Sequence, residues 1–199
     1  MNNRNRLKTP PLKFDPFSDR RSRDIRNQLS ESFVRSINVM DSTHFDRTAR
    51  DIVADHPAKI YHDYIVDRLK IYQHAYDQIQ SGGFTDARQQ VPILWNIGLF
   101  FEVHELLEDL WQPAKGDLKK ALKGLIQAAG VYVHLQQGNQ KAAKGLAKRA
   151  LSHLEQAGDC LIFIDGIADL AQKLHHLDDI PPNLTMVKDN ENKIRKKTA

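Results

Sequence analysis

Apolar residues recur every three or four positions through most of this 199-residue chain. In residues 140–157, alanine and leucine follow i, i+3, i+4, i+7 spacing, and lysine and arginine fill the opposite face. Residues 25–40, 58–80 and 117–137 have a similar period. No segment alternates polar and apolar residues over enough positions to predict a sheet. The sequence therefore predicts an all-α protein.

The breaks between these helical stretches are short and fall at proline and glycine. Pro57, the Ser-Gly-Gly at residues 81–83 and the Gly138–Asn139 pair each end a helical stretch. Helices joined by short loops tend to pack antiparallel, so we expect an antiparallel helical bundle built of helical hairpins. No period of about 34 residues repeats, which argues against a solenoid of tetratricopeptide type.

The net charge of +4 is concentrated at the two ends of the chain. Residues 1–26 contain eight Lys or Arg against three Asp, and residues 188–199 contain five against two acidic residues, so the middle of the chain is acidic. The simplest interpretation is a pair of solubilising tails, and the alternative is weak, salt-sensitive contact with a polyanion. No zinc-finger spacing or ribonucleoprotein motif predicts specific recognition of nucleic acid.

The sequence predicts no membrane-spanning helix and no secretory signal. The longest nearly apolar run, VPILWNIGLFF, is much shorter than the ~20 residues that a spanning helix needs. The single cysteine, Cys160, excludes an internal disulfide framework and fits a reducing compartment, so we expect a cytoplasmic protein. Its expected parts are a disordered basic tail (1–22), an N-terminal helical extension (23–83), a helical-bundle domain (84–180) and a second disordered basic tail (181–199).

The stretch FFEVHELLEDLW, residues 100–111, combines a largely apolar helix with an ionisable pair. On a helical wheel at about 100° per residue, His104 and Glu108 lie between Phe101 and Trp111, at the border of the apolar arc. Residues four apart on a helix are neighbours, so the two side chains can pair. If both are buried they need such a partner, because an unpaired buried charge is costly.

Three interpretations of this pair stay open. It can be a structural pair that ties helices together, or a ligand or catalytic site in which Glu108 orients or deprotonates His104. It can also supply two metal ligands, with His134 as the best candidate for a third. The zinc-protease motif is absent, because Glu108 stands where that motif needs a second histidine.

The next helix carries a second polar line. Gln127 and His134 are two turns apart on one side of it, with Gly130 and Val131 beside them. This line can be an exposed surface, or it can be the face that meets His104 and Glu108. We expect the second arrangement, in which two antiparallel helices enclose a polar pocket.

These residues also form a recognisable motif, which resembles domain-of-unknown-function family 309 over roughly residues 94–170. The hallmark of that family is an aromatic-x-x-His-Glu-x-Leu-Glu-x-x-Trp helix, then Gly-Leu-Ile-Gln, a histidine seven residues later, and Gly-Asn. The resemblance implies an all-helical fold and supports one cluster, but it implies no established reaction or cofactor. The matching positions are Phe101, His104, Glu105, Leu107, Glu108, Trp111, Gly124, Leu125, Ile126, Gln127, His134, Gly138 and Asn139.

From these observations we expect a buried polar cluster that binds a small polar or anionic ligand, with acid–base chemistry by His104 and Glu108. The alternatives are a non-catalytic protein–protein interaction module, in which the cluster only fixes helix packing, and a metal-binding bundle using His104, Glu108 and His134. Whether the chain is an enzyme or a homo-oligomer, and which cofactor or partner it uses, the sequence leaves unknown. The predicted ligand-binding residues are Glu105, Trp111, Gln127, His134 and Asn139.

Overall fold

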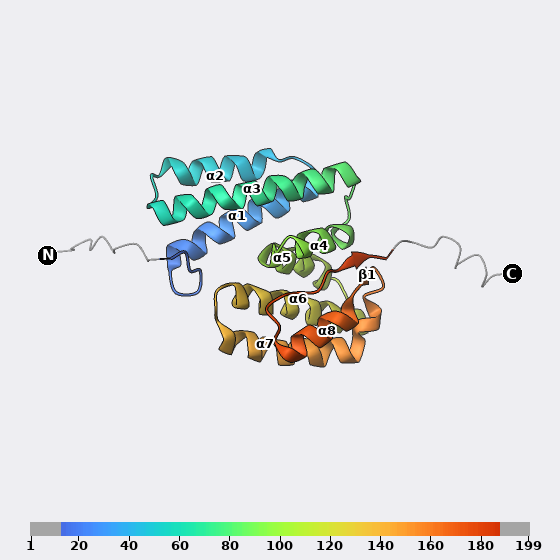
Figure 1. The fold of residues 1–199 in the computed structure, drawn as a ribbon. Helices are drawn as coiled ribbons and strands as arrows, with labels where there is room; N and C mark the ends of the chain where they lie inside the picture. Colours follow the sequence, from blue (N-terminus) through green and yellow to red (C-terminus); the bar gives the residue numbers. More distant parts are fainter. Residues whose placement is uncertain (1–12, 188–199) are drawn as a thin grey trace. The chain divides into compact units, whose positions relative to one another are not determined.

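A computed structural model describes residues 13–187 of the chain. The chain divides after Gly83 into two compact units, the N-terminal unit and the C-terminal unit (Figure 1). The described residues form the helices α1–α8, one short 3-10 helix and a pair of two-residue strands, so the predicted all-α class is confirmed. Within residues 13–187, no helix is both long enough and apolar enough to cross a membrane.

The N-terminal unit contains α1 (Arg20–Val39), α2 (Thr43–Ala54) and α3 (Lys59–Gly82). The side chain of Asp19 caps α1 by accepting a hydrogen bond from the backbone N–H of Ser22 at 2.7 Å. The core of the unit is aromatic, with rings from all three helices in contact. The buried rings in contact with one another are Phe33, Phe45, Tyr72 and Tyr76.

The C-terminal unit begins with α4 (Ala87–Asn96) and α5 (Phe100–Trp111). The loop between them turns at Gly98, whose φ of +79° lies in the left-handed region that glycine adopts without strain. The side chain of Gln136 donates a hydrogen bond to the Gly98 carbonyl at 3.0 Å. This contact ties the loop that precedes α5 to the next helix.

The helices α6 (Gly116–Gln136) and α7 (Gln140–Ala157) form the closest helix pair in the C-terminal unit (Figure 1). They approach closely because Gly124 has no side chain: a Cβ there would lie 3.0 Å from atoms of His153 and Leu154. The loop after α6 turns at Gly138, and Asn139 caps α7 by accepting a hydrogen bond from Ala142 N–H at 3.3 Å. This pair confirms the predicted helical hairpin.

The chain after this hairpin adds a short strand pair and a last helix to the C-terminal unit. After the 3-10 helix Gly158–Cys160, the strand β1 (Ile164–Asp165) pairs antiparallel with β2 (Thr185–Met186). The helix α8 (Ile167–His176) lies between the two strands in sequence and packs against α7.

Both predicted tails extend too far into the chain, since residues 13–22 and 181–187, which were assigned to them, belong to the described structure. Residues 1–12 and 188–199 lie outside the described part of the chain. Phe14, assigned to the first tail, stacks on Tyr64 with 3.5 Å between ring centroids. In the second tail, Pro182 accepts a hydrogen bond from the Trp95 indole N–H at 2.8 Å, and Leu184 exchanges two hydrogen bonds with the Asn96 side chain. The composition of these segments predicted disorder, because their partners are distant in sequence and composition does not detect such pairing.

Candidate functional site

Helix α5 has a buried inner face and a partly exposed polar row. Its apolar residues Phe100, Val103, Leu106 and Leu107 are buried, whereas the side chains of His104 and Glu108 are 31% and 42% exposed. The structure therefore differs from the predicted burial of this pair. Both side chains can meet a solute without a change of fold.

His104 lies between two carboxylates of its own helix. Its Nδ1 is 3.3 Å from Glu105 Oε1, and its Nε2 is 3.7 Å from Glu108 Oε1. The imidazole ring is parallel to the Phe101 ring, with 6.2 Å between centroids. A neutral imidazole has one donor and one acceptor nitrogen, whereas an imidazolium offers a donor to both carboxylates. Each ring nitrogen of His104 therefore has a carboxylate oxygen nearby.

Trp111 continues this row and lies next to two lysines that the sequence did not predict. Lys119 and Lys123, both on α6, place their Nζ atoms 4.5 Å and 4.6 Å from the centroid of the indole ring. Such distances are typical of cation–π contacts. The signal in the sequence is the i, i+4 spacing of the two lysines just after the loop, but it acquires a meaning only when α6 is packed beside α5.

Glu102 is the ionisable residue of α5 that is fully buried. On the same helical wheel Glu102 falls beside the polar residues Glu105 and Asp109, a position typical of exposure, but its side chain is 0% exposed. A helical wheel gives the angular position of each residue, and the buried side is then inferred from residue types. The actual burial depends on which segments pack against each side of the helix.

Gln127 does not face the His104 pair but helix α7. Its Oε1 lies 3.0 Å from His153 Nδ1, which is also 2.8 Å from the Arg149 carbonyl oxygen. Because both oxygens are acceptors, Nδ1 carries the proton and donates to them. Gly124 and Gly130, on the same side of α6, also approach α7. The Gln127–His153 bond therefore joins the two helices of the hairpin, and His153 was missed in the sequence.

His134 and Asn139 are the other two predicted site residues, one in α6 and one in the loop that follows it. His134 is half-buried, with its Nδ1 buried, and its carbonyl accepts hydrogen bonds from the N–H groups of Gln137 and Asn139. The Asn139 side chain caps α7. Among residues 13–187, no three His, Cys, Asp or Glu are placed to hold a metal ion, so His104, Glu108 and His134 do not form the metal site considered above.

A separate cavity of about 460 Å³ lies beside the loop between α4 and α5. Its wall includes the mutually packed rings of Trp95, Phe100 and Tyr132. The Tyr132 hydroxyl is buried and makes no hydrogen bond with any residue in the described part of the chain. Burial raises the pKa of this phenol, and the carboxylates of Asp178 and Asp169 raise it further. The hydroxyl is therefore un-ionised at neutral pH.

Replacing Tyr132 with phenylalanine is expected to raise the free energy of unfolding by about 1 kcal/mol, because a buried hydroxyl without a partner costs about 1–3 kcal/mol. Urea unfolding followed by circular dichroism measures the difference. A loss of stability in Tyr132→Phe would instead show that the hydroxyl is bonded to a group held in the cavity.

Comparison with known proteins locates the similarity in the C-terminal unit. An uncharacterised protein of Aquifex aeolicus (strain VF5) is 35% identical over 66 residues, which is 33% of this chain and 20% of that protein. The match thus covers about a fifth of the length of this relative. No solved structure matches the chain. The model of the family "Domain of unknown function (DUF309)" matches residues 89–146, which contain every predicted site residue from His104 to Asn139, and this match confirms the resemblance inferred from the motif.

Proposed function

We propose that the C-terminal unit binds a small polar ligand along the exposed row of α5, with His104 exchanging a proton with it. The observation that carries this proposal is the position of the His104 ring between the Glu105 and Glu108 carboxylates, with 31% of its side chain exposed. A base needs access to the proton that it takes, and a partly exposed imidazole has that access. The flanking carboxylates hold the ring in this position.

The charges along the row indicate what kind of ligand fits. His104, Glu108 and Trp111 share one side of α5, and seven residues of helix span about 10 Å. The carboxylates are at one end of this distance, and the Lys119 and Lys123 ammonium groups are beside Trp111 at the other. A ligand with an anionic group for the lysines and an acidic N–H or O–H group for His104 complements both ends.

Nuclear magnetic resonance of the 15N-labelled imidazole tests the proposal. The probes are small hydroxy and amino acids, including glycerate, serine and phosphoserine. At least one probe is expected to give a saturable shift of the His104 signals. Glu108→Gln is expected to weaken that response about tenfold, since hydrogen bonds to charged groups contribute about 1.5–3 kcal/mol. His104→Gln is expected to abolish the binding.

Asp109→Asn is the matched control, because Asp109 is an exposed carboxylate that follows Glu108 in sequence and lies about 100° away from it around α5. It removes the same charge and is expected to leave the response unchanged. If Glu108→Gln and Asp109→Asn weaken probe binding equally, the effect comes from the change in net charge and not from contact with the Glu108 carboxylate. No response to any probe would contradict the proposal.

The second candidate is a non-catalytic interaction module, and the Gln127–His153 bond favours it. This bond joins α6 to α7 and needs no ligand, so part of the motif is explained by helix packing alone. The two candidates differ in what Glu108→Gln does. Unchanged probe binding with reduced stability would favour the module.

A further inference from the structure

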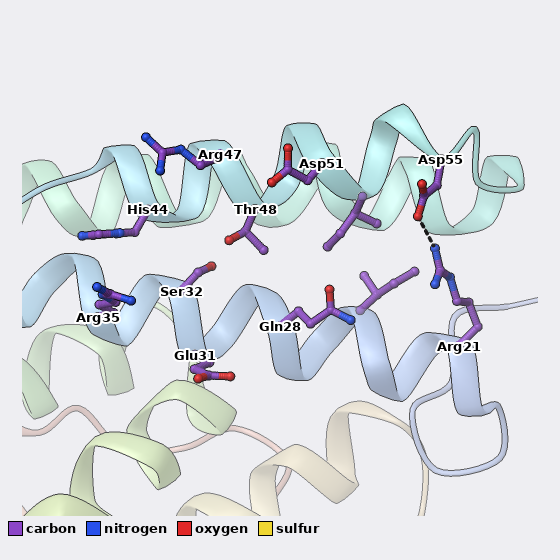
Figure 2. Close-up of a pocket in the computed structure, with 12 residues that line it drawn as sticks. Arg21, Gln28, Glu31, Ser32, Arg35, His44, Arg47, Thr48, Asp51 and Asp55 are labelled. Carbon is purple, nitrogen blue, oxygen red and sulfur yellow. Dashed lines mark ion pairs between the residues drawn. The ribbon is translucent and has the colours of Figure 1, made fainter.

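A groove of about 620 Å³ runs between α1 and α2 of the N-terminal unit (Figure 2). Its floor contains the apolar side chains of Ile25 and Ile52, which are 0% and 6% exposed. Polar and charged residues of both helices form its walls. They are Arg21, Gln28, Glu31, Ser32 and Arg35 of α1, and His44, Arg47, Thr48, Asp51 and Asp55.

The two ends of the groove differ in charge. At one end Arg21 and Asp55 pair across the helices, with 3.6 Å between Nη2 and Oδ2, and this pair neutralises both charges (Figure 2). At the other end His44 lies between the side chains of Arg35 and Arg47 (Figure 2). Three groups that can carry positive charge therefore gather at one end.

The two arginines at this end are available to a ligand. Arg35 and Arg47 are exposed, and within the described residues neither makes a hydrogen bond or an ion pair. Acidic groups are also close: Asp41 Oδ2 is 3.9 Å from His44 Nε2, and Glu31 and Asp51 line the groove four residues from Arg35 and Arg47. Hydrogen bonds from Thr43 lower the pKa of Asp41, and the charges of His44 and Arg47 contribute, so this carboxylate is ionised. Neither arginine forms an ion pair with these carboxylates within the described residues, so both guanidinium groups keep N–H donors for a ligand.

Uncharged donors adjoin the cationic end. The side chains of Thr48 and Gln28 point into the space between the helices (Figure 2), and no described residue accepts a hydrogen bond from either. Ser32, by contrast, donates its hydroxyl hydrogen to the Leu29 carbonyl at 2.8 Å. Thr48 therefore offers a hydroxyl donor beside the arginines, and Gln28 offers an amide farther along the groove.

We propose that this groove binds a phosphate monoester. Its phosphate lies among Arg35, His44 and Arg47, and its organic part lies over Ile25 and Ile52. Arginine pairs with phosphate through two parallel N–H bonds, and a phosphate dianion can pair with both Arg35 and Arg47. The volume is within the usual range for a small-molecule site, about 300–1,000 Å³.

The acidic residues of the groove favour one terminal phosphate over a nucleic-acid strand. Asp51 follows the cationic end along α2, and Glu31 is on the facing helix. A phosphodiester chain passing through the groove would bring successive phosphates against these carboxylates. A ligand with a single anionic group avoids that repulsion and places its neutral part on the apolar floor.

Titration calorimetry of the full chain with phenyl phosphate tests the proposal, because the phenyl group suits the apolar floor. Arg35→Gln and Arg47→Gln are each expected to weaken binding about tenfold, as loss of a charged hydrogen bond does. Arg50→Gln is the matched control: Arg50 is exposed on α2, carries the same charge and does not line the groove. It is expected to leave the affinity unchanged.

Inorganic phosphate is expected to compete with phenyl phosphate, whereas benzoate, which has one negative charge, is expected to compete more than tenfold less well. Absence of phenyl phosphate binding, or equal weakening by Arg47→Gln and Arg50→Gln, would overturn the proposal. So would a short oligonucleotide that displaces phenyl phosphate from the wild type but not from Arg47→Gln, because that would make the groove a nucleic-acid site. All of these substitutions are in α1 or α2 and none is in α5, so failure here is distinct from failure of the proton-exchange site.

Discussion

Replacing Trp95 with alanine is expected to lower the free energy of unfolding of the C-terminal unit by about 3–5 kcal/mol, the usual cost of truncating a buried tryptophan. The indole is 1% exposed and packs edge-to-face on Phe100 and Tyr132, with centroids 5.1 Å and 5.4 Å away. Its N–H also donates to the Pro182 carbonyl at 2.8 Å, so the variant loses the contact that holds the segment before β2. Urea unfolding followed by circular dichroism measures the loss.

Two variants separate the contributions to this loss. Trp95→Phe keeps an aromatic ring but removes the donor to Pro182, and it is expected to cost less than Trp95→Ala. Trp111→Ala is the control, since Trp111 is the other tryptophan of the chain and is only half-buried. If Trp111→Ala destabilises the protein as much as Trp95→Ala does, the aromatic cluster around Trp95 is not the main core of this unit.

Local signals in the sequence predicted the helices but not all of their ends. The predicted span 140–157 coincides with α7, and 117–137 differs from α6 by one residue at each end. Helix α1 begins at Arg20, five residues before the first apolar position used for its prediction. The cap by Asp19 allows these polar first residues to be helical, and hydrophobic periodicity cannot detect such a turn.

Long-range pairing accounts for most of what the sequence could not predict. The strand pair β1–β2 and the bonds from Trp95 and Asn96 to residues 182–184 join positions far apart in the chain. Each partner segment is short, and Pro181 and Pro182 resemble the start of a disordered tail. Nothing local distinguishes such a segment from one without partners.

The same distinction applies to the candidate site. The proximity of His104 to Glu108 follows from i, i+4 spacing and needs no tertiary information. The partner of Gln127 depends on how α6 is rotated between its neighbours, and the structure turns this residue toward His153 on α7. The absence of a side chain at Gly124 was a usable signal, because a glycine within a helix often marks a close approach of another element.

Replacing Phe33 with alanine is expected to destabilise the N-terminal unit by about 3–5 kcal/mol. Phe33 is 0% exposed and stacks on Tyr72, with 4.1 Å between centroids and 17° between ring planes, while Phe45 lies 5.8 Å away. The ring thus connects α1 with both other helices of this unit. Its removal leaves a cavity that no neighbouring side chain can fill without breaking one of these contacts.

Hydrogen exchange read by mass spectrometry locates this effect, because it reports on the amides of α1–α3 separately from the rest of the chain. A loss of 3–5 kcal/mol accelerates exchange through global opening of the unit by roughly a hundredfold or more. Phe17→Ala is the matched control: Phe17 is 38% exposed, and its truncation is expected to change exchange far less. If Phe33→Ala and Phe17→Ala accelerate exchange in α3 equally, the stacking of Phe33 on Tyr72 does not stabilise the unit.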